Sequence, residues 1–215
     1  MWPDISKLPR FSLDSSNVYL GNTVYTVALD DGYLLGILSS WATWFFISKT
    51  AQPLRLRGDR WQYRLFTQFM ESVPIPNASP DDRGAIAELA TRCGTFGRAQ
   101  HELQTRVQER IVKSFGEAPT GESLGKLNQK AQAWWEISVN ELGAALKTSF
   151  KLPNNPLKSP RTADEWEPYL AEKRAENDRL GRSIADAEFE INKRVFHLFN
   201  LSSDEAALLM REVEH

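Results

Sequence analysis

The chain has 215 residues, of which 41% are hydrophobic and 25% charged, and its formal net charge is −2. This is the composition of an ordinary globular protein, and its slight acidity excludes a uniformly basic nucleic-acid binder, so any contact with nucleic acid must come from a local patch. The single cysteine, Cys93, excludes an intrachain disulfide and fits a reducing compartment, so we expect a cytoplasmic location.

The first 31 residues contain two short runs that alternate apolar and polar side chains, at 17–20 and 23–29. Gly21-Asn22 lies between them and is a turn signal. This pattern predicts a small hairpin or a pair of strands.

An apolar, uncharged run follows from Gly32 to Ser48 and predicts one helix. It is shorter than the roughly 18–20 residues that span a bilayer, and serine and threonine interrupt it. Its apolar side chains cover most faces of a helix, which is typical of a helix buried in a domain. A membrane segment is the alternative, but we expect a core helix and no membrane partner.

The strip from Lys49 to Arg64 joins cationic and aromatic side chains, and Asp59 is its single acid. Arginine presents a planar fork that fits phosphate or guanine, glutamine can pair with adenine, and aromatic rings stack on bases. A strand is predicted over 61–66, followed by an extended segment at Val73–Pro76. An ordinary polar loop with surface arginines is the other interpretation. The candidate DNA-binding residues are Lys49, Arg55, Arg57, Arg60, Trp61, Gln62, Tyr63 and Arg64.

Helical signals dominate after residue 76. Ser79-Pro80-Asp81-Asp82 is a helix start, and apolar spacing continues the helix to about Phe115, with Gly94 and Gly97 able to bend or split it. A second helix is expected from about Ser123 to Phe150. The residues expected to be buried in it are Leu124, Leu127, Ala131, Trp135, Leu142 and Leu146.

The last third of the chain predicts a long helix and a short one. Thr162-x-x-Glu165 resembles a capping box, and Pro168 predicts that the long helix restarts there. Ser202-x-x-Glu205 begins a last helix that ends at Glu214. We expect the apolar stripe of the long helix to bury against the other helices or against a second copy of the chain, which would make a homodimer through the helical part. The stripe consists of Leu180, Ile184, Ala187, Ile191, Val195 and Leu198.

These elements predict an α+β fold that is mainly α, with a small mixed α/β recognition part at 1–76 and a helical part with a long C-terminal helix at 77–215. No catalytic constellation is recognisable: the histidines lack metal-ligand spacing, and Cys93 lies on an apolar stripe. Neither a glycine-rich turn for S-adenosylmethionine nor an Asn-Pro-Pro clamp for a flipped base occurs. We therefore expect the chain alone to be non-catalytic, without catalytic, cofactor-binding or metal-binding residues.

Several short motifs together carry a resemblance to a known family. They are PDI-x-x-LPRF at 3–11, YLLGILSS at 33–40, LRGDRWQY at 56–63, VPIP at 73–76 and EFEINKRVFHLFNLS-x-x-E at 188–205. In order and spacing, over nearly the whole chain, they resemble the TaqI-like C-terminal specificity domain of adenine-N6 DNA methyltransferases. That family includes type IIG restriction–modification enzymes and related phage-defence methylases.

The resemblance implies a target-recognition domain that positions double-stranded DNA for methylation by a catalytic domain absent from this chain. The chain is then a fragment, an excised domain or a separately encoded specificity subunit of an adenine-specific methyltransferase. S-adenosylmethionine is expected in the associated catalytic domain or subunit and no cofactor in this chain. One alternative is a protein-interaction module that docks on a methylase or a defence-complex partner without direct DNA contact. Another is a remnant enzyme with an unrecognised site.

Overall fold

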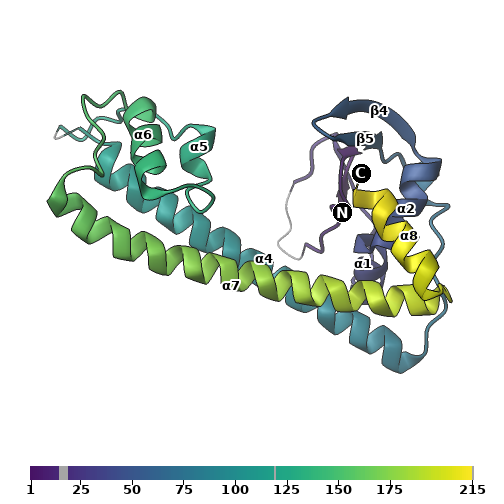
Figure 1. Ribbon diagram of the computed structural model, residues 1–215. Helices are drawn as coiled ribbons and strands as arrows, with labels where there is room; N and C mark the ends of the chain where they lie inside the picture. The colour runs from purple at the N-terminus through teal and green to yellow at the C-terminus, as the bar shows by residue number, and fades with distance from the viewer. Residues whose placement is uncertain (15–18, 119, 215) are drawn as a thin grey trace. The chain divides into compact units, whose positions relative to one another are not determined.

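A computed structural model describes residues 1–14, 19–118 and 120–214, and it confirms the predicted α+β, mainly α, class. The chain forms two compact units: unit 1 is Met1–Thr95 with Ile184–His215, and unit 2 is Phe96–Ser183. The long helices α4 (Pro80–Phe115) and α7 (Pro160–Leu198) each contribute residues to both units (Figure 1). The predicted recognition part at 1–76 lies in unit 1, which also takes in the chain's last segment.

Short strands open unit 1. β1 (Trp2–Pro3) pairs antiparallel with β3 (Val24–Tyr25), and the rings of Trp2 and Tyr25 stack at 5.7 Å. The turn predicted at Gly21 forms, with the Val24 N–H donating to the Gly21 carbonyl. Among the described residues, the strand after this turn, Val24–Tyr25, pairs with the N-terminal strand Trp2–Pro3. The run at 17–20 lies partly outside the described residues.

A second sheet has three antiparallel strands in the order β2-β5-β4. Its members are β2 (Ile5–Ser6), β4 (Gln52–Arg57) and β5 (Arg60–Arg64). β5 confirms most of the strand predicted at 61–66. β4 was not predicted, and it makes the arginine-rich strip a β-hairpin instead of a loop.

The single helix predicted over 32–48 is wrong, because the run forms α1 (Gly32–Ser39) and α2 (Trp41–Thr50). Ser40 has an extended backbone between them, and its hydroxyl accepts the Thr43 N–H as the N-cap of α2. Ile37, Trp44 and Ile47 are buried, as a core segment requires. Among the described residues, no helix is long and apolar enough to cross a membrane.

The rest of unit 1 packs around these two helices. α3 (Thr67–Met70) follows β5, and the segment at 73–76 is in neither helix nor strand. α8 (Ser203–Glu214) packs on α2 (Figure 1) and begins with the predicted capping box, in which the Glu205 carboxylate accepts the Ser202 N–H at 2.8 Å. Ile86 and Ala90 of α4 pack with α1 and with Ile191 of α7, so part of the long helix's apolar stripe has its partners within the chain.

Both long helices begin with the same Ser-Pro pair. The Ser79 hydroxyl accepts the Asp82 N–H at 3.1 Å at the start of α4, and the Ser159 hydroxyl accepts the Thr162 N–H at 3.3 Å at the start of α7. α4 is not split at Gly94 or Gly97. The predicted restart at Pro168 is also wrong: α7 continues through it. Asp164 and Pro168 are exposed, so water can satisfy the carbonyl that the proline leaves unpaired.

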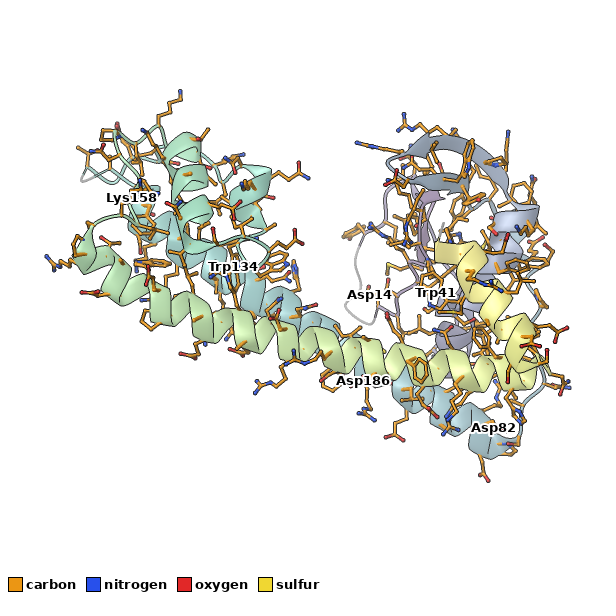
Figure 2. The ribbon with its side chains drawn as sticks, viewed as in Figure 1. Asp14, Trp41, Asp82, Trp134, Lys158 and Asp186 are labelled. Carbon is orange, nitrogen blue, oxygen red and sulfur yellow. The ribbon has the colours of Figure 1, made fainter. Side chains whose placement is uncertain are left out.

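Unit 2 contains two short helices where one long helix was predicted at 123–150. These are α5 (Gln129–Gln132) and α6 (Val139–Ser149), which begins with a capping box of Ser138 and Glu141. Trp134 lies between them, is fully buried and donates its indole N–H to the Gln104 carbonyl of α4 (Figure 2). The sequence predicts that Trp135 is the buried tryptophan of this segment, but Trp135 is only half-buried.

Candidate nucleic-acid interface

The candidate site is the β4–β5 hairpin of unit 1. Its strands are joined by the two-residue turn Gly58-Asp59, and Gly58 has a φ of 62°. Glycine adopts this angle without strain, and a type II′ hairpin turn requires a positive φ at this position. The turn fixes the register, so that Arg57 lies opposite Arg60, Leu56 opposite Trp61 and Arg55 opposite Gln62.

Strand alternation divides the candidate residues between two faces of the hairpin, because successive side chains point to opposite sides of a sheet. The strip is therefore not one mixed arginine–aromatic surface. The arginine face consists of Arg55, Arg57, Arg60, Gln62 and Arg64, and the aromatic face consists of Leu56, Trp61 and Tyr63.

Positive charge gathers on the arginine face near the turn. Arg57 and Arg60 are a directly opposed cross-strand pair, and the Lys7 ammonium donates to the Arg57 carbonyl. Every residue of β4 is exposed. Within the described part of the chain, neither Arg57 nor Arg60 has an ion-pair partner. Like charges opposed across a sheet are destabilising unless something else neutralises them.

The other two arginines of this face have side-chain partners. The Arg55 Nε–H donates to the Gln62 carbonyl oxygen at 2.8 Å. Arg64 lies 3.7 Å from the Asp4 carboxylate, and its guanidinium lies over the Phe66 ring at 5.4 Å. Arg64 is therefore tied to the base of the sheet, whereas Arg55 is held on the exposed part of the hairpin.

The aromatic face has an exposed end and an anchored end. Trp61 is 47% exposed and lies opposite Leu56, which is 58% exposed. Tyr63 instead packs edge-on against Trp44 of α2 at 5.8 Å between ring centroids. Tyr63 thus fixes the hairpin to the core, and Trp61 is free to contact a partner.

Lys49 lies outside the hairpin, in the last turn of α2. Its ammonium is 2.8 Å from the Glu212 carboxylate of α8 and lies over the Phe45 ring at 5.1 Å. The structure therefore separates Lys49 from the arginines with which the sequence grouped it.

A second surface feature of unit 1 escaped the sequence analysis. A groove of about 570 Å³ lies between α7, α8 and the start of α2. Trp41 (labelled in Figure 2), Phe189 and Met210 line it, and Phe189 is 71% exposed. Glu188 is also in the lining, and desolvation by the surrounding protein raises the pKa of its carboxyl. Phe189 falls outside the regular apolar stripe of α7, and that irregularity was the available signal.

The candidate metal ligands and the single cysteine are the other chemistry-bearing groups of the chain. Within the described ranges, no three His, Cys, Asp or Glu side chains are grouped so that they could hold a metal ion. The pKa of the Cys93 thiol is raised to about 11 by burial and by the nearby Glu188, which keeps the thiol protonated and a poor nucleophile at neutral pH.

The fold is thus an α+β, mainly helical protein in which an exposed arginine-bearing hairpin is mounted on a helical core. The chain belongs to the family described as a domain of unknown function, DUF8810, which matches residues 79–195. The match covers α4 to most of α7 and does not include the hairpin. No curated protein and no solved structure matches the chain.

Proposed function

We propose that this chain is the DNA target-recognition domain of an adenine-specific DNA methyltransferase or restriction–modification enzyme. It acts in the cytoplasm, binds double-stranded DNA through the β4–β5 hairpin, and presents the DNA to a catalytic domain or subunit outside this chain. That partner binds S-adenosylmethionine and carries out the methyl transfer.

The observation that carries the proposal is the cross-strand pair of the exposed Arg57 and the half-buried Arg60, with Lys7 beside them at the hairpin turn. Such a pair lowers the stability of a hairpin unless an anion neutralises it. A DNA phosphate is such an anion, and its neutralisation also releases condensed counterions. In a chain whose net charge is −2, the four arginines of the hairpin concentrate positive charge at one place.

The shape of the element supports the same function. A two-stranded β-ribbon fits the major groove of B-DNA, where each base pair presents a distinct pattern of donors and acceptors. β4 is an edge strand of the β2-β5-β4 sheet, so one long side of the ribbon is open to a partner. The motifs that resemble the specificity domain, including LRGDRWQY at 56–63, also lie in unit 1.

Duplex DNA binding by the full chain tests the proposal. Wild-type affinity should fall with rising salt, and the double variant Arg57→Gln, Arg60→Gln should bind more weakly and reduce the slope of log affinity against log salt by about 2. The control double variant Lys147→Gln, Lys158→Gln removes two exposed cations of unit 2 and should retain the wild-type slope. A wild-type chain that binds no duplex at low salt would overturn the proposal.

The groove of unit 1 favours a second candidate, a module that docks on a methylase or defence-complex partner without touching DNA. The largely exposed Phe189 beside Trp41 is the observation behind it, because such apolar side chains are common anchors of protein interfaces. The two candidates differ in a simple measurement. The docking module predicts that Phe189→Ser abolishes capture of its methylase partner and that the Arg57, Arg60 double variant changes nothing.

A further inference from the structure

We infer that Arg55 is the residue of the hairpin that reads a guanine, and that Gln62 is its positioning residue. This inference rests on the proposed function and divides the arginine face into one base contact and two phosphate contacts.

The contact between Arg55 and Gln62 fixes the orientation of both side chains. They are cross-strand partners, and the Arg55 Nε–H donates to the Gln62 oxygen at 2.8 Å. Since Nε–H is a donor only, it must face the amide oxygen, which points the Gln62 NH₂ away. The guanidinium is therefore held by its Nε edge, and among the described residues no hydrogen bond or ion pair occupies its two terminal NH₂ groups.

Those two groups match one base in particular. Guanine presents the O6 and N7 acceptors side by side in the major groove, and a bidentate arginine is their commonest specific partner. A guanidinium held in advance loses less conformational freedom on binding than a free one. A β-bulge directly before Arg55, where the pairing shifts between Pro53 and Arg55, also changes the direction of β4 at this point.

Arg57 and Arg60 differ from Arg55, whose guanidinium is held by Gln62. They face each other across the turn, and within the described residues no side chain fixes either guanidinium. Arg57 is exposed and Arg60 is half-buried. Long, mutually repelling side chains of this kind suit phosphates, which position a protein on DNA without specifying sequence. Arg64 is tied to Asp4 and Phe66 and takes neither role.

Selection from a duplex library with twelve randomised base pairs, using the full chain, tests the assignment. The wild type should enrich a motif with guanine at one position, preferred by about 5- to 150-fold. Arg55→Lys keeps the charge but loses the fork, so this preference should fall below about twofold while affinity for unselected duplex changes little. Arg57→Lys is the matched control and should retain the motif.

Two further variants test the positioning role. Gln62→Ala removes the acceptor and should weaken the guanine preference, whereas Gln62→Glu keeps an oxygen opposite the Arg55 Nε–H and should restore it, with lower overall affinity from the added negative charge. A preference that survives Gln62→Ala would overturn the positioning role.

The outcomes also separate this inference from the proposed function. If the wild type selects a motif that Arg55→Lys leaves unchanged, the assignment of Arg55 is wrong and the DNA-recognition function stands. If the wild type binds duplex DNA but selects no sequence, the assignment of Arg55 is overturned as well. A chain that binds no duplex at all contradicts the proposed function itself.

Discussion

The side-chain oxygen of Asn192 accepts the backbone N–H of Trp41 at 2.7 Å, across 151 positions of sequence. Asn192 is 7% exposed, and its NH₂ donates to the Glu188 carbonyl at 2.8 Å. The first N–H groups of a helix have no partner within the helix, so α7 completes the start of α2. Because β4 begins two residues after α2 ends, this bond helps to fix the support of the hairpin.

Asn192→Ala should lower the free energy of unfolding by about 0.5–1.5 kcal/mol, the net contribution of a typical hydrogen bond, because it removes the acceptor of the part-buried Trp41 N–H. Denaturant unfolding followed by far-UV circular dichroism measures the loss. Asn154→Ala, in an exposed loop, is the matched control and should change stability by less than about 0.5 kcal/mol. Equal stability of the two variants would show that the bond contributes nothing.

Gly36→Ala should destabilise unit 1 by about 1–3 kcal/mol, the usual cost of overpacking a core. A Cβ at Gly36 would lie 2.4 Å from Cγ2 of Ile86, a fully buried side chain that has little room to move. Gly84 is an exposed helical glycine of α4 with nothing within 4 Å of an added Cβ. Gly84→Ala should therefore raise stability by up to about 1 kcal/mol. Thermal unfolding measures both variants, and midpoint temperatures that shift in the same direction for Gly36→Ala and Gly84→Ala would contradict this packing.

Trp134→Ala should remove about 3–5 kcal/mol from the stability of unit 2, as the truncation of a fully buried tryptophan does. Trp135 is its neighbour in sequence and meets its ring edge-on at 5.7 Å, but is only half-buried. Trp135→Ala should consequently cost much less. Hydrogen exchange of α5 and α6 amides is the measurement, and a larger loss of protection in Trp135→Ala would reverse the assignment of the core.

The sequence predicted best those features that depend on local chemistry. Ser79-Pro80 and Ser202-x-x-Glu205 begin helices because each satisfies its own backbone N–H groups within one turn. Ser40 was ambiguous, because a serine within an apolar run can bond backward in a continuous helix or cap a new one. The pairing of Val24 with the N-terminal strand could not be predicted from the sequence, because it depends on packing between Trp2 and Tyr25.

The candidate site was predicted as a set of residues but not as an arrangement. Its division into two faces follows from a turn at Gly58-Asp59 and strict alternation on both sides, a signal that the sequence does contain. The separation of Lys49 could not be predicted, because its partner Glu212 lies 163 positions away. The pairing of Arg55 with Gln62 follows from the same turn, whereas the bulge in β4, which shifts the pairs beyond Arg55 by one residue, has no signal in the sequence.

Glu141 should make unit 2 less stable in acid. Its carboxylate accepts the Ser138 N–H at 3.0 Å and the Ser138 hydroxyl at 2.9 Å, and lies 3.1 Å from Lys130. These contacts lower its pKa from 4.5 to about 2. Between these two values the unfolded chain binds the proton more readily than the folded chain does, so the stabilisation is complete above about pH 4.5 and is lost as the pH falls toward about 2.

Glu141→Gln should therefore be less stable than the wild type at pH 6, and the difference should shrink as the pH falls toward about 2. Denaturant unfolding of both proteins across this range measures the change, and Glu167→Gln, an exposed site in α7, should follow the wild type throughout. An NMR titration of the Glu141 carboxyl measures its pKa directly, and the expected midpoint is about 2. A midpoint close to 4.5 would mean that the Ser138 cap does not hold the carboxylate, and the acid sensitivity of unit 2 would need another cause.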